Sequence, residues 1–175
     1  MSTIVIYKSK YGSTKKYAEW ISEELSCRMA EAKEIKPDML TEYDTIIYGG
    51  GLYAEVINGV HLITKNLDRL SGKKLIIYST GITPIDCRDY YDKLVIEKNF
   101  KPGMTDKIKV YNLPGKMIID ELSIVHRTAI KSLKKIMSKK ENPTEMEKLL
   151  IRLCDSSVDL TDRNAISELL EYAKN

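Results

Sequence analysis

Five short apolar runs, separated by turns and amphipathic stretches, constrain the fold of this chain more than any other feature. The first run, residues 3–7, is a continuous run rich in β-branched side chains, which is typical of a strand buried on both faces. Further runs, some more weakly patterned, follow at 27–32, 43–48, 73–79 and 107–113. Buried strands that alternate with helices form a parallel sheet covered on both faces. We therefore predict an α/β fold with a three-layer, doubly wound, five-stranded parallel sheet.

The stretches between these runs show helical periodicity. In residues 14–25, Tyr17, Ile21 and Leu25 recur every four positions and form one apolar stripe, which predicts an amphipathic helix. Three more helices are predicted at 59–70, at 86–99 and from Thr161 onward.

Residues 115–156 interrupt the simple alternation of strand and helix. A helical stripe with spacings of three and four residues runs through them, made of Ile118, Leu122, Val125, Ala129, Leu133 and Ile136. A second helix is predicted over 144–153, and an extended segment at 157–159 is expected to resume the fifth strand. We therefore predict one domain, residues 1–175, in which a helical insertion at about 115–156 precedes the last helix.

The composition argues against several classes of protein. A net charge of +3 is too weak to indicate nucleic-acid binding, so no nucleic-acid partner is expected. The three cysteines form no C-x-x-C pair, and neither His61 nor His126 belongs to a metal-ligand spacing, so no metal site is expected. No apolar run approaches the ~20 residues that span a bilayer, and the N-terminal residues lack the features of a signal peptide. The expected location is cytoplasmic.

The first loop with binding chemistry lies between the first strand and the first helix. Its sequence is Ser9-Lys10-Tyr11-Gly12-Ser13-Thr14. Hydroxyls and backbone amides at a helix N-terminus favour an anion, and Gly12 lets the backbone come close to it. The loop has neither the Walker A nor the G-x-G-x-x-G pattern, which favours a monophosphate held without a metal. An ordinary helix cap rich in Ser and Thr is the alternative.

Two more loops follow later strands. The second, residues 49–55, has three glycines that permit unusual backbone conformations, and its Leu52 and Tyr53 can lie against a flat ring. The third, residues 79–84, offers hydroxyls and amides to the polar edge of a ring. Ligands of open α/β sheets bind at the carboxyl ends of the strands, so we expect the three loops to converge there. The alternatives are a flexible turn for the second loop and a simple βα turn for the third.

The first loop resembles the phosphate loop of flavodoxins, T/S-x-T/Y-G-N/S-T, here with Tyr11 and Ser13. The order of elements and the three loops are similar to those of the flavodoxin superfamily across most of the chain. The Gly-Gly-Gly-Leu-Tyr-Ala loop and the helical insertion resemble one branch more closely, that of the menaquinone-dependent protoporphyrinogen dehydrogenases. The resemblance implies the strand order 2-1-3-4-5 and noncovalently bound FMN as cofactor.

The resemblance also implies which residues bind FMN. The phosphate would be held by Ser9, Lys10, Tyr11, Gly12, Ser13 and Thr14. The isoalloxazine ring would be flanked by Gly50, Gly51, Leu52, Tyr53 and Ala54, with a peptide at Gly50 or Gly51 that flips on reduction. The pyrimidine edge of the ring would be reached by Ser79, Thr80, Gly81 and Ile82. The electron chemistry then belongs to the flavin, and no catalytic acid or base is predicted.

The basic charge of the chain departs from that of electron-carrier flavodoxins, which are typically acidic. Segment 116–140 carries seven basic residues against only Asp120 and Glu121. A basic amphipathic helix can lie on an anionic membrane surface, which would suit a quinone acceptor and a peripheral location at the inner face of the membrane. The alternative is a solvated basic face on a helix that packs against the domain or against another subunit, as in a homodimer.

The predicted function is that of an FMN-dependent oxidoreductase or electron-transfer protein. By resemblance it would be a dehydrogenase of the protoporphyrinogen-oxidising kind with a quinone acceptor. Its expected partners are a redox protein or a small-molecule substrate, and the basic insertion would attract the carboxylates of a porphyrinogen. Two alternatives stay open: a non-catalytic electron carrier between proteins, and a flavin-free interaction module on the same fold.

Overall fold

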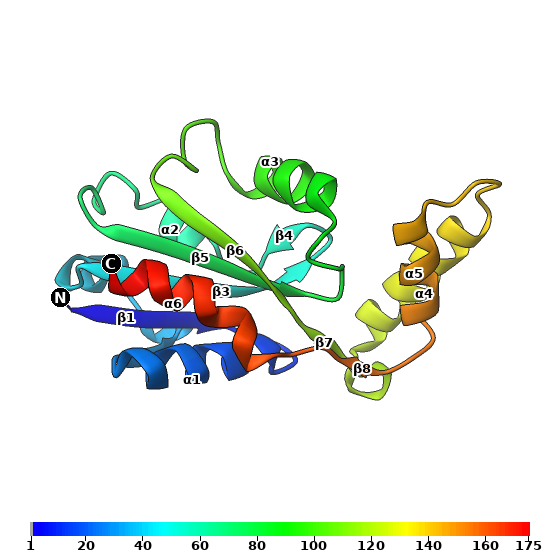
Figure 1. Cartoon of the computed structure of the whole chain (residues 1–175), viewed down its shortest axis with the longest axis horizontal. Coiled ribbons are helices and arrows are strands. Elements are labelled where there is room, and N and C mark those ends of the chain that lie inside the picture. Colours follow the sequence, from blue (N-terminus) through cyan, green and yellow to red (C-terminus); the bar gives the residue numbers. More distant parts are fainter. Residues whose placement is uncertain (1) are drawn as a thin grey trace.

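A parallel sheet forms the centre of the molecule, with strands in the order β2-β1-β3-β5-β6 (Figure 1). The structure is a computed structural model that describes residues 2–175; Met1, the first residue of the predicted domain, lies outside them. The parallel strands are β1 (Thr3–Lys8), β2 (Arg28–Glu31), β3 (Thr45–Tyr53), β5 (Lys74–Gly81) and β6 (Ile108–Pro114). A short strand, β4 (Val56–Ile57), pairs antiparallel with β3. The predicted α/β class and the order 2-1-3-4-5 of the parallel strands are confirmed.

Each face of the sheet has its own apolar core. Successive side chains of a strand point to opposite faces, so Ile4 and Ile6 belong to one core and Val5 to the other. The core with Val5 is closed by α1 (Ser13–Leu25) and by η5 (Arg163–Ile166) with α6 (Ser167–Lys174). The other core is closed by η1 (Ala32–Glu34), η2 (Pro37–Glu42), α2 (His61–Thr64), η3 (Tyr90–Val95) and α3 (Ile96–Asn99). The sheet and the helices that cover its two faces thus form three layers.

Two predicted helices are shorter or less regular than expected. The helix predicted over 59–70 is limited to α2, and the turns after it close three residues back, as from Asn66 N to Ile63 O at 3.0 Å. Such 3₁₀-type turns rarely extend into long helices. The helix predicted over 86–99 is π-helical in η3 before it becomes α-helical in α3. The loop before it is held by buried Tyr91, whose hydroxyl donates to the Thr83 carbonyl at 2.7 Å.

Strand β3 runs through Gly49, Gly50 and Gly51 to Tyr53, so the expectation of a glycine loop after residue 48 is wrong. None of these three glycines has a positive φ. Glycine is needed here because neighbouring groups pack directly against the backbone of β3. A Cβ at Gly49 would lie 2.0 Å from the Tyr78 ring. At Gly50 a Cβ would meet the backbone of Asn58 at 2.7 Å. The ladder with β5 continues to Gly51, and beyond it Leu52 and Tyr53 pair with β4.

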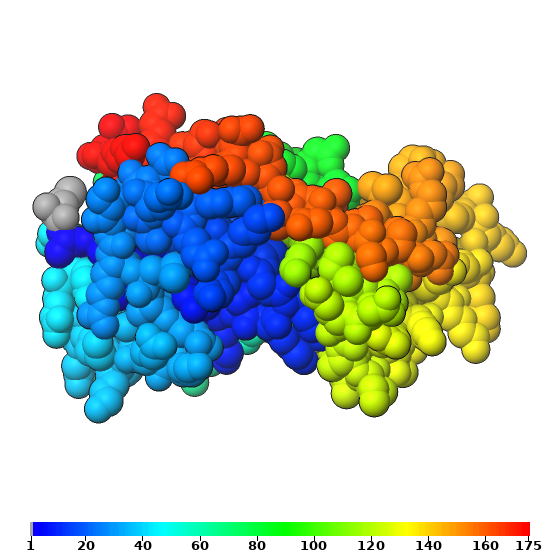
Figure 2. All heavy atoms as spheres, turned by 90° about the horizontal axis from the view of Figure 1, so that it is seen from below, coloured from blue at the N-terminus to red at the C-terminus, as the bar shows by residue number. Residues whose placement is uncertain are grey.

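The insertion is a helical hairpin that projects from one end of the sheet (Figure 1). After β6 the chain forms β7 (Lys116–Met117), η4 (Ile119–Glu121), α4 (Ile124–Ser138), α5 (Glu145–Leu153) and β8 (Val158–Asp159). Strands β7 and β8 pair antiparallel and carry the hairpin between them. In the space-filling view the hairpin forms one end of the molecule (Figure 2). The extended segment expected at 157–159 therefore pairs beside the continuation of the fifth strand and does not resume it.

The alternative in which α4 packs along the domain is wrong. Within the predicted stripe, Val125, Leu133 and Ile136 are exposed, whereas the buried residue of α4 is Met137. Because β7 and β8 lift the hairpin away from the sheet, the first turn of α4 contacts the domain through His126, and the helix packs on α5 (Figure 1). Among residues 2–175, no helix is both long and apolar enough to cross a membrane.

Candidate functional site

The three predicted loops converge at the carboxyl ends of β1, β3 and β5. Three contacts join them pairwise: Thr14 with Thr80, Leu52 with Gly81, and Tyr11 with Tyr53. The two threonine hydroxyls lie 2.8 Å apart, a Cβ at Gly81 would lie 3.5 Å from the Leu52 side chain, and the two tyrosine ring centroids lie 6.3 Å apart. The convergence expected from the sheet topology is present.

The first loop presents an uncapped helix N-terminus. Helix α1 begins at Ser13, directly after Gly12, whose φ of 92° is accessible to glycine at little cost. No side chain caps α1, so the N–H groups of its first turn keep their hydrogen-bonding capacity, and the positive end of the helix dipole favours an anion. Ser9 Oγ accepts from the Gly12 N–H at 3.1 Å and retains its own O–H for a ligand. This loop is a cradle for an anion.

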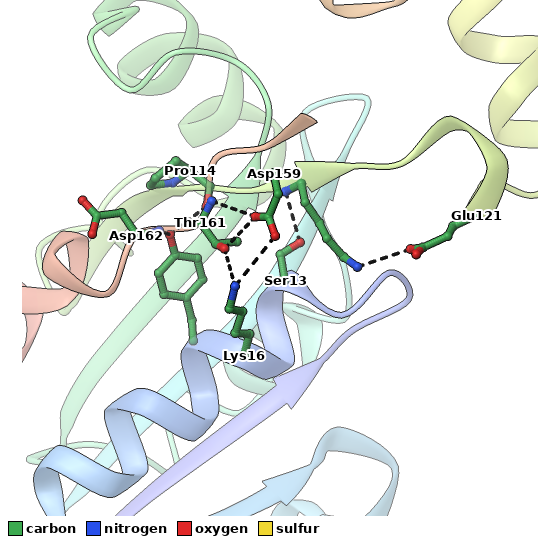
Figure 3. Close-up of polar contacts among 9 residues, drawn as sticks. Ser13, Lys16, Pro114, Glu121, Asp159, Thr161 and Asp162 are labelled. Carbon is green, nitrogen blue, oxygen red and sulfur yellow. Dashed lines mark hydrogen bonds and ion pairs between the residues drawn. The ribbon is translucent and has the colours of Figure 1, made fainter. Parts of the chain in front are cut away.

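Lys116 places a cation at this cradle, and sequence reasoning missed it. A Cβ at Gly12 would lie 3.7 Å from Lys116 Nζ, so the ammonium group lies against the first loop. The Lys116 backbone N–H donates to Ser13 Oγ at 3.4 Å, and its Nζ lies 3.3 Å from Glu121 (Figure 3). From sequence, Lys116 was only one of several basic residues of the insertion. Nothing local to position 116 signals its proximity to Gly12.

A polar network fixes the base of the hairpin on α1 (Figure 3). Lys16 Nζ donates to Thr161 Oγ1 at 2.8 Å. The Tyr17 hydroxyl donates to the Pro114 carbonyl at 2.8 Å and accepts from the Asp162 N–H at 3.0 Å. Burial, opposed by the Asp162 N–H, raises the pKa of Tyr17 to about 12, so this hydroxyl keeps its proton. These bonds hold the end of β6, and hence β7, beside the first loop.

The second loop is a tight hairpin turn. Ala54 and Glu55 both have positive φ, 46° and 63°, and connect Tyr53 of β3 to Val56 of β4. Asn99 steadies the turn through a 2.6 Å hydrogen bond to the Glu55 carbonyl. The sequence carries no Asn-Gly or Asp-Gly signal for such a turn. Two non-glycine residues at positive φ store strain at the rim of the site.

Gly50 and Gly51 lie behind this turn, inside β3. The Asn58 N–H donates to the Gly51 carbonyl at 2.9 Å. A peptide flip at Gly50 or Gly51 stays a prediction, and a flip that turns the Gly51 carbonyl would have to break this hydrogen bond.

The third loop starts later than expected, because Ser79 and Thr80 belong to β5 and are buried. Ser79 Oγ donates to Asn112 Oδ1 at 2.7 Å, and the Thr80 hydroxyl is paired with the first loop. These hydroxyls therefore hold neighbouring elements together and do not face outward. Gly81 ends the strand and half-buried Ile82 follows it, so these two residues form this part of the rim.

A cluster of rings and hydroxyls joins the insertion to the first two loops. The Tyr11 hydroxyl lies 2.7 Å from His126 Nδ1 and accepts from the Ser123 N–H at 3.3 Å. The His126 ring lies 5.0 Å from the Tyr53 ring, and Lys10 Nζ lies 3.5 Å from Ser123 Oγ. Sequence reasoning gave His126 no role. Only the fold brings it to the site, 115 positions from Tyr11.

The charge state of this cluster follows from its surroundings. Burial, together with the Lys10 ammonium, lowers the pKa of His126 and so favours the neutral imidazole. Burial, assisted by Tyr11, raises the pKa of Tyr53 to about 12. Burial also acts to raise the pKa of Tyr11, but the hydrogen bonds with Ser123 and the charge of Lys10 outweigh it and lower that pKa. The charged groups beside these rings are the ammonium group of Lys10 and, at the first loop, that of Lys116, which is paired with Glu121.

The residues present fit the FMN that the sequence predicts. The first-turn amides of α1 and the Lys116 ammonium suit a phosphate. Leu52 and Tyr53 lie next along the edge and suit a flat aromatic ring. The acidic side chain of the second loop, Glu55, is paired with Lys98 at 3.1 Å. The arrangement can hold an anionic ligand with a ring system.

The fold is that of an α/β protein whose candidate site lies at the carboxyl ends of its parallel strands. The chain belongs to the flavodoxin-domain family, whose sequence model matches residues 4–145. It is 31% identical over 114 residues to an uncharacterized protein of Methanocaldococcus jannaschii, a match that covers 62% of this chain and 67% of that protein.

Two solved flavodoxins are similar to this chain. One is the two-electron reduced flavodoxin of Megasphaera elsdenii, at 14% identity and a TM-score of 0.47, with 88% of this chain and 99% of that chain covered. The other is oxidised flavodoxin 2 of Bacillus cereus, at 16% identity and a TM-score of 0.41, with 89% and 96% covered.

Proposed function

We propose that this protein binds FMN at the carboxyl edge of its sheet and acts in electron transfer as an oxidoreductase. The observation that carries the proposal is the uncapped N-terminus of α1 at Gly12, with Lys116 Nζ beside it and the Tyr11 and Tyr53 rings next along the edge. The helix N-terminus with Lys116 complements a phosphate, and the adjacent tyrosine rings complement a flat ring. Membership of the flavodoxin-domain family supports the proposal.

The parts of the site have separate tasks under this proposal. The first-turn amides of α1 and the Lys116 ammonium hold the phosphate, and the charge of Lys10 adds to the attraction. Leu52 and Tyr53 orient the ring, and the strained Ala54–Glu55 turn fixes their position. Bound FMN supplies redox chemistry that no side chain can perform, while the chain supplies binding, orientation and electrostatics.

The absorbance spectrum of the purified protein tests this proposal. We expect flavin absorption bands that bleach on anaerobic reduction with dithionite and return in air. If the cofactor is lost during purification, added FMN is expected to bind with a change in its fluorescence. A colourless protein that leaves the fluorescence of added FMN unchanged would contradict the proposal and leave the flavin-free interaction module as the function.

A dehydrogenase that oxidises protoporphyrinogen and reduces a quinone is the second candidate. It is favoured by the ammonium group of Lys10, which lies between the first loop and Ser123 of the insertion and can attract the carboxylates of a porphyrinogen as well as a phosphate. Turnover of protoporphyrinogen with menaquinone by the purified protein would establish this activity. Rapid reoxidation by a redox protein without such turnover would instead identify an electron carrier between proteins.

A further inference from the structure

The outer side of α4 exposes a continuous row of apolar side chains. Val125, Leu133 and Ile136 are 74%, 48% and 62% exposed, and Ala129 between them is exposed as well. Spacings of three and four residues place these four on one face of the helix, and we call them the apolar stripe. Ile124, at 85% exposure, precedes the stripe in sequence and lies on the neighbouring side of the helix. Single exposed apolar residues are ordinary, whereas a contiguous patch marks a contact surface.

The apolar stripe is not part of the packing of the hairpin, because α4 turns a different row of residues inward. His126, Ile130, Lys134 and Met137 are the buried or half-buried members of that row. His126 meets the Tyr11 hydroxyl, Lys134 pairs with a carboxylate just after α5, and Met137 is buried. The inner row thus makes the contacts that hold α4 in the hairpin, and the apolar stripe stays exposed to solvent.

A row of lysines lies beside the apolar stripe. Lys131, Lys135 and Lys139 are exposed and spaced four residues apart, and in the described part of the chain none forms an ion pair. The neighbouring Lys134 and Lys140, by contrast, each pair with a carboxylate. Helix α4 contains no acidic residue, and like charges four residues apart repel each other. The lysine row therefore lacks the counter-charge that an external anionic surface would provide.

We propose that α4 docks this protein on an anionic lipid surface, with the apolar stripe at the boundary between headgroups and acyl chains and the lysine row on the lipid phosphates. Both features are those of a helix that lies in the membrane interface, and basic side chains are attracted to anionic lipids. The helix belongs to a hairpin that projects from the domain, so the domain does not obstruct its approach to a surface (Figure 1).

Two other occupants fit the surface less well. A second copy of this chain seated on the apolar stripe would bring two lysine rows together, and such like-charge contacts are costly. A protein partner is disfavoured by composition, because the stripe and the row contain no Trp, Tyr or Arg, the residues that dominate binding at protein interfaces. Lysine is itself depleted at such interfaces.

Docking through α4 has a consequence for the candidate site. The first turn of α4 carries His126, which contacts Tyr11 and Tyr53 at the rim of the site. A membrane contact along α4 therefore brings the rim close to the lipid surface. Docking itself requires no cofactor, so its test is independent of FMN binding.

Sedimentation with lipid vesicles tests the proposal. The full-length protein is expected to sediment with mixed phosphatidylcholine–phosphatidylglycerol vesicles and not with phosphatidylcholine alone. Reversal of the lysine row, K131E/K135E/K139E, is expected to weaken binding by on the order of 100-fold, from the usual attraction of about three basic side chains. The matched control is K101E/K107E/K109E, which makes the same change in net charge on exposed lysines that precede or begin β6. This control is expected to bind more tightly than the lysine-row variant.

A second variant separates insertion from simple charge attraction. V125S/L133S/I136S keeps every lysine and is expected to bind anionic vesicles more weakly and to be released by salt at a concentration where the wild type stays bound. All variants change exposed side chains, and circular dichroism checks that they fold.

Three results would overturn the proposal. One is equal sedimentation of the wild type and K131E/K135E/K139E, or equal binding to both vesicle types. The second is no sedimentation of the wild type at low salt. The third is a dimer in analytical ultracentrifugation that V125S/L133S/I136S dissociates, which would assign the apolar stripe to a second copy of the chain.

Discussion

At the scale of single residues, the anion cradle at the first loop depends on one glycine and one lysine from different halves of the chain. Gly12 adopts a φ of 92° and lets α1 begin without a cap. Lys116 brings its ammonium group against that glycine while its backbone bonds Ser13, 103 positions away. The sequence predicted hydroxyls and backbone amides at this loop, and the fold adds the ammonium group of Lys116 to them.

Lys116→Met is expected to weaken FMN binding by roughly 10- to 100-fold, the usual effect of losing one charge-assisted hydrogen bond. Binding of riboflavin, which lacks the phosphate, is expected to stay unchanged. Fluorescence titration of the flavin-free protein measures both affinities. The control Lys109→Met makes the same charge change on an exposed lysine of β6, and we expect normal FMN binding. Equal losses for FMN and riboflavin in Lys116→Met would show that Lys116 does not contact the phosphate.

His126 is expected to make the stability depend on pH with a defined sign. Burial and Lys10 lower its pKa in the folded state below the usual value of about 6.5. The unfolded chain therefore binds more protons as the pH falls through that value. The contribution of His126 to stability is complete above about pH 6.5 and is lost progressively below it. Denaturant unfolding between about pH 7.5 and about pH 5.5 is expected to show a smaller decrease for His126→Gln than for the wild type.

The matched control is His61→Gln, since His61 is exposed and its side chain makes no hydrogen bond within residues 2–175. It removes one imidazole that does not contact Tyr11, so the slope of His126→Gln is compared with the slopes of this variant and of the wild type. A His126→Gln variant whose free energy of unfolding falls as steeply as that of the wild type would contradict this account of the Tyr11–His126 contact.

At the scale of secondary-structure elements, two joints position the site. One is the β3–β4 turn, where Ala54 and Glu55 hold positive φ without a glycine. The other is the junction of α1 with the base of the hairpin, where Tyr17 bonds both chain segments that lead to and from the insertion. The first joint sets the ring side of the site, and the second sets the position of Lys116.

Ala54→Gly is expected to raise the free energy of unfolding by about 0.5–1 kcal/mol, because glycine adopts a positive φ without the penalty that alanine pays. An Ala→Gly substitution usually lowers the free energy of unfolding, so the expected change here has the opposite sign. The control Ala129→Gly, at an exposed position of α4, is expected to lower the free energy of unfolding by about 1 kcal/mol. Denaturant unfolding of the two variants measures both changes, and a destabilising Ala54→Gly would show that the turn is not strained.

Tyr17→Phe is expected to lower the free energy of unfolding by about 2 kcal/mol, because it leaves the Pro114 carbonyl and the Asp162 N–H without their shared partner. Tyr172→Phe, at a half-exposed ring, is the control and is expected to change stability by less than about 0.5 kcal/mol. Thermal or denaturant unfolding distinguishes them. Equal stability of Tyr17→Phe and the wild type would mean that water replaces both bonds.

At the scale of the whole molecule, the sequence predicted what local patterns determine and missed what distant contacts determine. The five strands and α1 were predictable because their apolar periodicity is local. The extension of β3 through Gly49 was not predictable. It depends on the packing of the Tyr78 ring against Gly49, and not on strand propensity. The places of Lys116 and His126 in the site were hidden for the same reason, since both reach it only through the fold of the insertion.

The central claim is that the carboxyl edge of the sheet is an FMN site anchored at its phosphate end. Calorimetric titration of the flavin-free protein with FMN and then with riboflavin tests it most directly. We predict one FMN site per chain, with FMN bound at least about 100-fold more tightly than riboflavin, because the phosphate engages several charge-assisted hydrogen bonds at α1 and Lys116. Equal affinity for the two flavins, or no binding of either, would contradict the account.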